Sequence, residues 1–204
     1  MVTLALAAGY ATRMYPLTER FPKPLLPVAG RTILDRLLKD LDGIEAVERH
    51  IVVSNHKFIG AFEDWRAGAD LRKPVTLIDD GTMDNEGRLG AVKDIVLAIE
   101  AEQLDDDVFV LAADNLLDFS LGALVEGFME NRASRIFVYA EEDEQKLRRC
   151  GVATLDDAFR LVEMEEKPQR PKSRWAIPPF YLYAREDVKR IREAVAQRDR
   201  KSVV

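Results

Sequence analysis

Short, continuously apolar segments alternate along the first half of the chain with segments in which apolar residues recur at helical spacing. The apolar segments have the length and composition of strands buried on both faces: Val2–Ala8, His50–Ser54, Val75–Ile78 and Val108–Ala113. Helical spacing is clearest in residues 33–41 and 90–99. Strands that alternate with helices imply right-handed crossovers and a mostly parallel sheet covered on both faces. The sequence therefore predicts an α/β fold.

The pattern changes after residue 134, where short predicted strands follow one another with turns and loops between them. These strands are Arg135–Ala140, Gly151–Thr154, Arg160–Glu165 and Phe180–Tyr183, and the tail from Asp187 is predicted to be helical. The chain has 204 residues, which suits one domain. We expect a single domain, 1–204, in which a β-rich, ligand-facing second half, 135–204, is built onto the first, 1–134.

Composition and charge narrow the class of protein. Hydrophobic residues make up 47% and charged residues 32% of the chain, as in globular proteins with a substantial core. A formal net charge of −6 argues against nucleic acid as the main partner, because nucleic-acid binding depends on a basic surface. Cys150 is the sole cysteine, so no internal disulfide can form and a reducing, cytoplasmic location is expected. The apolar N-terminus lacks a preceding basic stretch and is too short to cross a bilayer, so we predict neither a secretion signal nor a membrane span.

The segment after the first predicted strand, GYATRMYPLTERFPKP, combines small residues, cations and prolines. In open α/β sheets, ligands bind outside the carboxyl ends of the strands, where this segment lies. Small residues let backbone N–H groups approach an anion, and Arg13 and Lys23 add positive charge on a loop that prolines stiffen. The alternative is a connecting loop whose two cations are solvated. A Walker A loop and a Rossmann dinucleotide fingerprint are both excluded, because the sequence lacks their glycines and Gly-Lys-Ser/Thr.

The longer segment LAAGYATRMYPLTERFPKPLLPVAG resembles the signature of the sugar-phosphate nucleotidyltransferases, the family of glucose-1-phosphate thymidylyltransferase and its uridylyl and cytidylyl relatives. The resemblance implies a Rossmann-like, three-layer nucleotide-diphospho-sugar transferase fold, with nucleotide bound by 1–134 and sugar phosphate by 135–204. It also implies that Arg13 and Lys23 are catalytic, binding the triphosphate and stabilising charge at the phosphorus under attack. Ala11 stands where the family more often has glycine. The loop that would contact the nucleotide comprises Leu6, Ala7, Ala8, Gly9, Tyr10, Ala11 and Thr12.

Asp114 follows the last predicted strand of the first half, in the segment VLAADN. A carboxylate at this edge of the sheet suits Mg²⁺, which keeps most of its waters and binds one or two protein carboxylates. From its position alone, Asp114 could equally cap a helix or close a turn. The resemblance implies that it is the family's magnesium ligand. The family's second metal carboxylate has no counterpart here, and the sequence suggests a C-terminally truncated reading frame.

The resemblance also implies residues that would recognise the base and the sugar. Asn85, five residues before Gly90, stands where the family reads its base with glutamine, and an asparagine amide still offers a donor and an acceptor. The segment EEKPQRPKSRWA resembles the family's sugar-phosphate motif, which places Glu166 on sugar hydroxyls and Lys167 on the sugar phosphate. Gly151 matches a glycine whose backbone approaches the sugar. On the residues alone, Asn85 could be an ordinary turn residue, and Glu166 and Lys167 an exposed pair at a strand end.

The resemblance predicts an enzyme that joins a nucleoside triphosphate (NTP) and a sugar 1-phosphate to give an NDP-sugar and pyrophosphate, with Mg²⁺ as cofactor. Two alternatives stay open from the sequence: a choline-phosphate cytidylyltransferase, and a relative that binds these ligands without turnover. The family's habit of forming dimers or tetramers makes a homo-oligomer possible.

Overall fold

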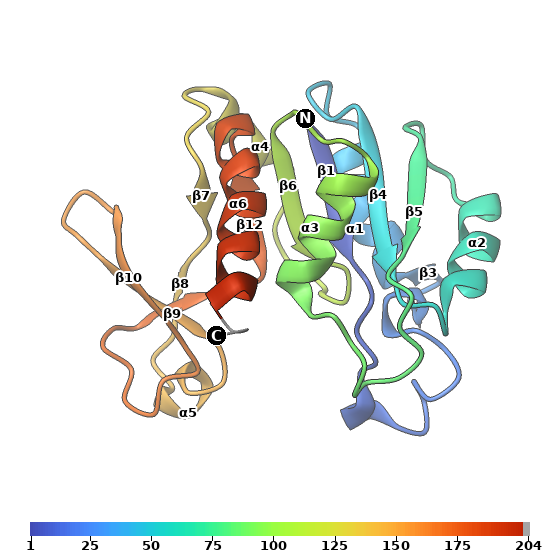
Figure 1. The fold of residues 1–204 in the computed structure, drawn as a ribbon, viewed down its shortest axis with the longest axis horizontal. Coiled ribbons are helices and arrows are strands. Elements are labelled where there is room, and N and C mark those ends of the chain that lie inside the picture. The colour runs from blue at the N-terminus through green and yellow to red at the C-terminus, as the bar shows by residue number, and fades with distance from the viewer. Residues whose placement is uncertain (202–204) are drawn as a thin grey trace. The chain divides into compact units, whose positions relative to one another are not determined.

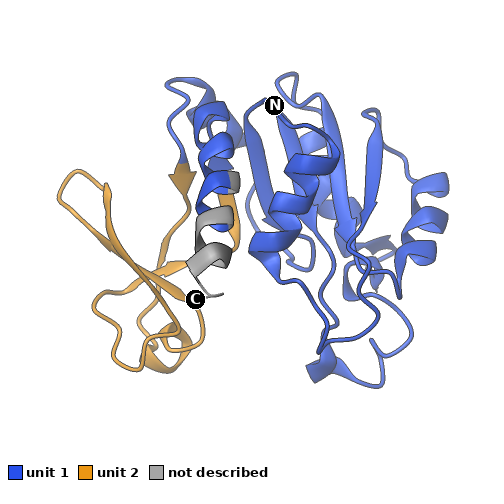
Figure 2. Cartoon of the chain, in the orientation of Figure 1, with its two compact units in different colours: residues 1–134, 182–204 blue, residues 135–181 orange. Residues whose placement is uncertain are grey.

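The structure is a computed structural model that describes residues 1–201, with the side chains of 192 and 196–201 excepted. The chain divides into two compact units (Figure 2). Unit 1 comprises Met1–Ser134 and Leu182–Val204, and unit 2 comprises Arg135–Tyr181. The first boundary falls where the sequence pattern changes, whereas the last segment of the chain groups with unit 1. The single-domain organisation stays a prediction.

A six-stranded sheet has the order β5-β4-β1-β6-β12-β7. Its strands are β1 (Val2–Leu6), β4 (Arg49–Ser54), β5 (Val75–Asp79), β6 (Val108–Ala112), β7 (Arg135–Ile136) and β12 (Phe180–Tyr183). β1 pairs in parallel with β4 and β6, and β4 pairs in parallel with β5. Leu4 lies between Ile51 and Val110, and all three side chains are fully buried. The predicted α/β fold with a mostly parallel sheet is confirmed.

The helices of unit 1 connect these strands and cover them. α1 (Ile33–Asp42) leads from β1 to β4, and α3 (Ala91–Ala101) leads from β5 back to β6. These two crossovers run in opposite directions along the sheet, so right-handed connections place the two helices on opposite faces, as Figure 1 shows. The remaining helices of this unit are α2 (Ile59–Gly68), α4 (Gly122–Met129) and α6 (Arg185–Lys201), of which α6 contacts α3.

The segment between β1 and α1 is long and mostly irregular, with two short 3₁₀ helices, η1 (Thr12–Met14) and η2 (Lys23–Leu25). A small hairpin, β2 (Pro27–Val28) and β3 (Arg31–Thr32), then leads into α1. Thr32 and Asp35 form a capping box, in which each side chain accepts a hydrogen bond from the backbone N–H of the other residue. This cap determines where α1 begins, and hence where the segment carrying Lys23 ends.

Unit 2 contains a four-stranded sheet of order β10-β9-β11-β8, and the strand pairs given for it are antiparallel. Its elements are β8 (Tyr139–Ala140), α5 (Glu144–Leu147), β9 (Gly151–Leu155), β10 (Leu161–Glu166) and β11 (Trp175–Ile177). A small core of Leu147, Val152 and Ala176 packs between α5 and the sheet. β10 lies at the edge of this sheet, and five of its six residues are exposed.

Some elements differ from the sequence-based predictions. The single strand predicted over Arg135–Ala140 is wrong: β7 and β8 belong to different sheets, because Ala140 pairs with Trp175 of β11 while β7 pairs elsewhere. α2, α4 and β11 were not predicted, since they are short or show little one-sided hydrophobicity. Within the described residues, no helix is long and apolar enough to cross a membrane.

Candidate functional site

A cavity of about 220 Å³ lies at the carboxyl ends of β1 and β6, within unit 1. Its lining residues are Leu6, Ala7, Gly9, Ala11, Lys23, Pro24, Ala112 and Asp114. Six of these belong to the site predicted from the sequence, and Asp114 is far along the chain from the other five. The parallel pairing of β1 with β6 brings them together, because both strands end at the same edge of the sheet.

The loop after β1 leaves open space on one side of its backbone. A Cβ atom added to Gly9 would meet no atom within 4 Å, so its backbone is accessible to a ligand. Ala11 has a φ of 46°, in the left-handed region, and its carbonyl accepts a hydrogen bond of 2.8 Å from Thr18 Oγ1. Glycine would adopt this conformation without strain, whereas alanine adopts it at a cost.

Lys23 and Asp114 form the charged part of the cavity. Lys23 Nζ lies 2.8 Å from Asp114 Oδ2, and Asn115 Nδ2 donates to Asp114 Oδ1 over 3.2 Å. The side chains of Lys23 and Asp114 are 27% and 43% exposed, so solvent and ligands can reach both. Pro22 and Pro24 flank Lys23 and restrict its backbone, and Pro24 is buried. The arrangement offers one cation and one hard oxygen ligand within a small cavity whose other lining residues are apolar or glycine.

Other residues of the predicted nucleotide loop lie outside the cavity lining. Ala8 and Tyr10 are buried, and the Tyr10 hydroxyl lies 3.0 Å from Thr82 Oγ1, so both pack the loop against its neighbours. Thr12 and Arg13 are exposed in η1. Within the described residues, Arg13 makes no side-chain hydrogen bond or ion pair, so its guanidinium is available to a ligand.

Asn85 and Gly90, the predicted base-recognition residues, also lie outside that lining. Gly90 caps the N-terminus of α3 with a φ of 87°, and Asn85 accepts a hydrogen bond from Arg88 through its backbone carbonyl. Their segment instead contains a feature that the sequence-based prediction missed. Asp94, in the first turn of α3, is only 5% exposed, and its Oδ1 has no hydrogen-bond partner within the described residues. Burial, with the charge of Asp80, raises the pKa of Asp94 to about 6. The sequence could have indicated this burial, because Asp94 lies at helical spacing from the other buried residues of α3, Ala98 among them.

The predicted sugar-phosphate residues lie together in unit 2. Gly151 of β9 is paired with Glu166 of β10, and Lys167 N donates to the Cys150 carbonyl over 3.0 Å. Glu166 and Lys167 form an exposed ion pair of 2.7 Å. A Cβ atom on Gly151 would lie 3.4 Å from Ile177, so the neighbouring side chain already crowds this backbone. A cavity of about 340 Å³ beside Lys167 is also lined by Arg148 and Arg170, and this basic lining suits a phosphate.

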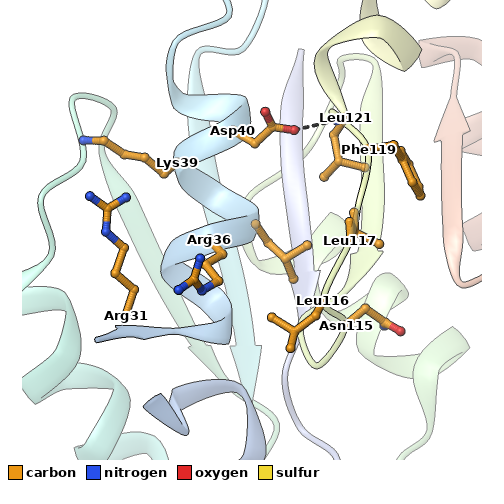
Figure 3. A pocket seen from close by; sticks show the side chains of 10 residues that line it. Arg31, Arg36, Lys39, Asp40, Asn115, Leu116, Leu117, Phe119 and Leu121 are labelled. Atoms are coloured by element: carbon orange, nitrogen blue, oxygen red, sulfur yellow. Dashed lines mark hydrogen bonds between the residues drawn. The ribbon is translucent and has the colours of Figure 1, made fainter. Parts of the chain in front are cut away.

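A larger cavity of about 390 Å³ lies elsewhere in unit 1, between α1 and the segment that follows Asp114 (Figure 3). Most of its charged groups already have structural partners. Arg36 donates to the Val28 carbonyl, Lys39 pairs with Asp70, and Asp40 accepts from the backbone of Leu121. None of the residues predicted to be functional lines it.

A comparison with protein families matches residues 2–203 to the model described as "Nucleotidyl transferase". The chain therefore belongs to the nucleotidyl transferase family.

Individual relatives make the similarity more specific. The chain is 30% identical over 185 residues to UTP–glucose-1-phosphate uridylyltransferase AglF of Haloferax volcanii, covering 90% of this chain and 72% of AglF. It is 31% identical over 190 residues to a glucose-1-phosphate thymidylyltransferase of Streptomyces antibioticus, covering 90% of this chain but 49% of that enzyme. Across several of the curated relatives it matches, the chain spans between 37% and 72% of their length. These names give no support to the choline-phosphate alternative.

A solved structure of a UDP-glucose pyrophosphorylase complexed with UDP-glucose has a TM-score of 0.77 to this chain at 17% identity. The alignment covers 93% of this chain and 78% of that one. At this identity, the likeness confirms the predicted nucleotide-diphospho-sugar transferase fold.

Proposed function

We propose that this chain transfers a nucleoside monophosphate from an NTP to a sugar 1-phosphate, which gives an NDP-sugar and pyrophosphate. The observation that carries the proposal is the meeting of Lys23, Asp114 and the open loop at Gly9 in one cavity at the carboxyl edge of the sheet. Family membership and the names of the relatives support the same reaction.

The proposed chemistry is a displacement at the α-phosphorus. A phosphate oxygen of the sugar 1-phosphate forms a new bond to this phosphorus, and the bond from phosphorus to the pyrophosphate oxygen breaks. The attacking oxygen is already ionised at neutral pH, so no general base is required. Arg13 and Lys23 bind the phosphate oxygens and stabilise the charge that develops on them, while backbone N–H groups near Gly9 orient the triphosphate.

Asp114 fits a divalent cation such as Mg²⁺. The carboxylate lies at the cavity, is partly exposed, and already holds a positive group, the Lys23 ammonium, at hydrogen-bond distance. Within the described residues, no group of three or more acidic, histidine or cysteine side chains gathers to bind a metal. A hydrated ion held by Asp114 and by phosphate oxygens needs no such group. When bound, the ion would neutralise charge on the triphosphate.

In unit 2, we assign Gly151, Glu166 and Lys167 to the sugar phosphate. The exposed carboxylate of Glu166 can accept hydrogen bonds from sugar hydroxyls, and the basic cavity beside Lys167 can accept the phosphate. Asn85 and Gly90 remain our candidates for the base. A cytoplasmic location and assembly into homo-oligomers, without nucleic acid or membrane as partner, belong to the same proposal.

Pyrophosphate release tests the reaction directly. The common NTPs are crossed with a panel of sugar 1-phosphates in the presence of Mg²⁺, and pyrophosphate is measured by a coupled enzyme assay. Release that requires both substrates, and an NDP-sugar seen by mass spectrometry, is the expected result. No release across the panel, with NTP binding detected by calorimetry, would instead identify a binding protein.

Arg13 gives a second test, because its side chain is exposed and without a described partner. We predict that Arg13→Ala lowers kcat by roughly 100-fold or more, as removal of a charge-stabilising donor does, and changes the free energy of unfolding by less than about 0.5 kcal/mol. Arg20→Ala, an exposed arginine in the same segment, is the matched control and should retain activity. Equal losses of activity and stability in Arg13→Ala would contradict its assignment.

A further inference from the structure

Both oxygens of the Asp114 carboxylate are engaged in the structure. Oδ1 accepts from Asn115 Nδ2 over 3.2 Å, a neutral contact that leaves the charge of the carboxylate available. Oδ2 accepts from Lys23 Nζ over 2.8 Å, which is a charge-assisted hydrogen bond. The proposed metal ligand is therefore already paired with the proposed phosphate-binding cation.

A metal ion and the Lys23 ammonium compete for this carboxylate because the two positive charges repel each other. A Mg²⁺ ion lies about 2.1 Å from its oxygen ligands, so an ion on Oδ2 would lie roughly 4 Å from an ammonium that is 2.8 Å from the same atom. Two positive charges at such a separation repel each other strongly in a partly desolvated cavity. A cation therefore binds this carboxylate more weakly while the Lys23 ammonium stays in place.

The cavity offers the displaced ammonium no other carboxylate. Asp114 is the one acidic residue among the residues that line it, and the rest are apolar or glycine apart from Lys23 itself. The backbone of Lys23 is held in η2 beside buried Pro24 and Leu25, so only the side chain is free to move. Triphosphate oxygens entering the cavity would supply the missing acceptors.

We infer that Lys23 competes with the metal ion for Asp114 in the nucleotide-free chain, and that the triphosphate releases this competition by binding the ammonium. Metal and nucleotide then bind cooperatively, since each favours the same separation of Lys23 from Asp114. Metal alone binds weakly, which keeps the carboxylate paired until an NTP arrives. This inference rests on the proposed metal and phosphate roles of the two residues.

The test is Mn²⁺ binding to the nucleotide-free chain, measured by electron paramagnetic resonance of the free ion. Lys23→Met removes the ammonium but keeps the length of the side chain, and it should bind Mn²⁺ about 5-fold more tightly than the wild type, as expected for the loss of a partly exposed ion pair. Lys39→Met is the matched control, because Lys39 forms an ion pair of 3.0 Å with Asp70 away from Asp114, and it should bind as the wild type does.

Asp114→Asn locates the ion. In the double variant Lys23→Met/Asp114→Asn the tighter binding should be lost, because it depends on the freed carboxylate. Equal Mn²⁺ affinity in Lys23→Met and wild type, with weaker binding in Asp114→Asn, would overturn the competition and retain the metal site. Tight binding in the double variant would also overturn it. Tighter binding by Lys23→Met, together with no pyrophosphate release by the wild type, would support the competition and contradict the proposed reaction.

Discussion

At the scale of single residues, backbone conformation and burial explain features that composition does not show. Alanine at position 11 has one methyl group more than the glycine expected there. Its energetic cost comes from the left-handed φ of 46°, which disfavours a residue with a Cβ atom. Asp94 is a charged residue on the buried face of α3, where a carboxylate has little solvation. In both cases the residue type conflicts with its position, as is common near functional sites.

The raised pKa of Asp94 predicts a pH-dependent cost. Its folded pKa of about 6 lies above the ordinary value of 3.8, so the protonated carboxyl favours folding at low pH and this contribution is lost as the pH rises through about 6. Ionised Asp94 then destabilises the fold by up to about 3 kcal/mol, from roughly two pKa units at 1.36 kcal/mol each. We expect Asp94→Asn to raise the free energy of unfolding at pH 8 and to change it little at pH 4.

Urea unfolding at the two pH values measures this effect. Glu100→Gln, an exposed position on the same helix, provides the control and should show no comparable dependence on pH. A stabilisation by Asp94→Asn of the same size at pH 4 and pH 8 would show that the carboxyl does not titrate in this range.

At the scale of elements, the start of α1 links several parts of unit 1. Asp35 completes the capping box through Oδ2, while its Oδ1 accepts from the Trp65 indole of α2 over 2.8 Å. Ile33 N, the first residue of α1, donates to the carbonyl of Leu26 just after η2. The helix cap therefore anchors the end of the segment that carries Lys23.

Removing the cap should destabilise unit 1 measurably. Thr32→Ala leaves the backbone N–H of Asp35 without its partner, and we expect a loss of about 1 kcal/mol in the free energy of unfolding. Thr32→Ser retains the hydroxyl and should restore most of that loss. The measurement is denaturant unfolding followed by circular dichroism, and equal stability of the alanine and serine variants would show that the cap contributes nothing.

At the scale of the whole molecule, three elements meet in a buried polar contact at the amino ends of the strands. The Nδ1 atom of His50 in β4 forms a hydrogen bond of 2.6 Å with Thr3 Oγ1 of β1. Its Nε2 atom lies 3.5 Å from Asp42 Oδ1 of α1. Burial lowers the pKa of His50 below its ordinary 6.5, against the opposing effect of Asp42, and the charge of Lys73 adds to the lowering. The neutral imidazole is therefore the form that the fold favours.

This contact predicts that stability falls in mild acid. Because the folded pKa of His50 is lowered, its contribution is complete above about pH 6.5 and is lost as the pH falls toward the folded value. The slope approaches about 1.4 kcal/mol per pH unit where only the unfolded chain is protonated. His50→Gln should remove this part of the dependence between pH 7 and pH 5, measured by thermal unfolding. An unchanged slope in the variant would assign the acid sensitivity to other groups.

Much of the fold could be predicted because it follows from local patterns. The four strands predicted in the first half, β1, β4, β5 and β6, appear within two residues of their predicted ends, and Phe180–Tyr183 matches β12. The prediction of one strand over Arg135–Ala140 failed because these residues favour extended structure in either sheet. Only the strands available for pairing decide that β7 joins one sheet and β8 the other. α2 was not predicted because Phe62 is its one buried residue, so its sequence shows no clear apolar stripe.

The sequence by itself determined the α/β alternation and predicted a phosphate-binding loop, because strand periods, turn residues and the signature are local properties of the chain. The tertiary structure decided which of the candidate residues meet. Lys23 and Asp114 are 91 positions apart, and they form an ion pair because β1 and β6 are neighbours in the sheet. The burial of Asp94 was likewise decided by packing. Contacts of this kind depend on strand order, which no local pattern specifies.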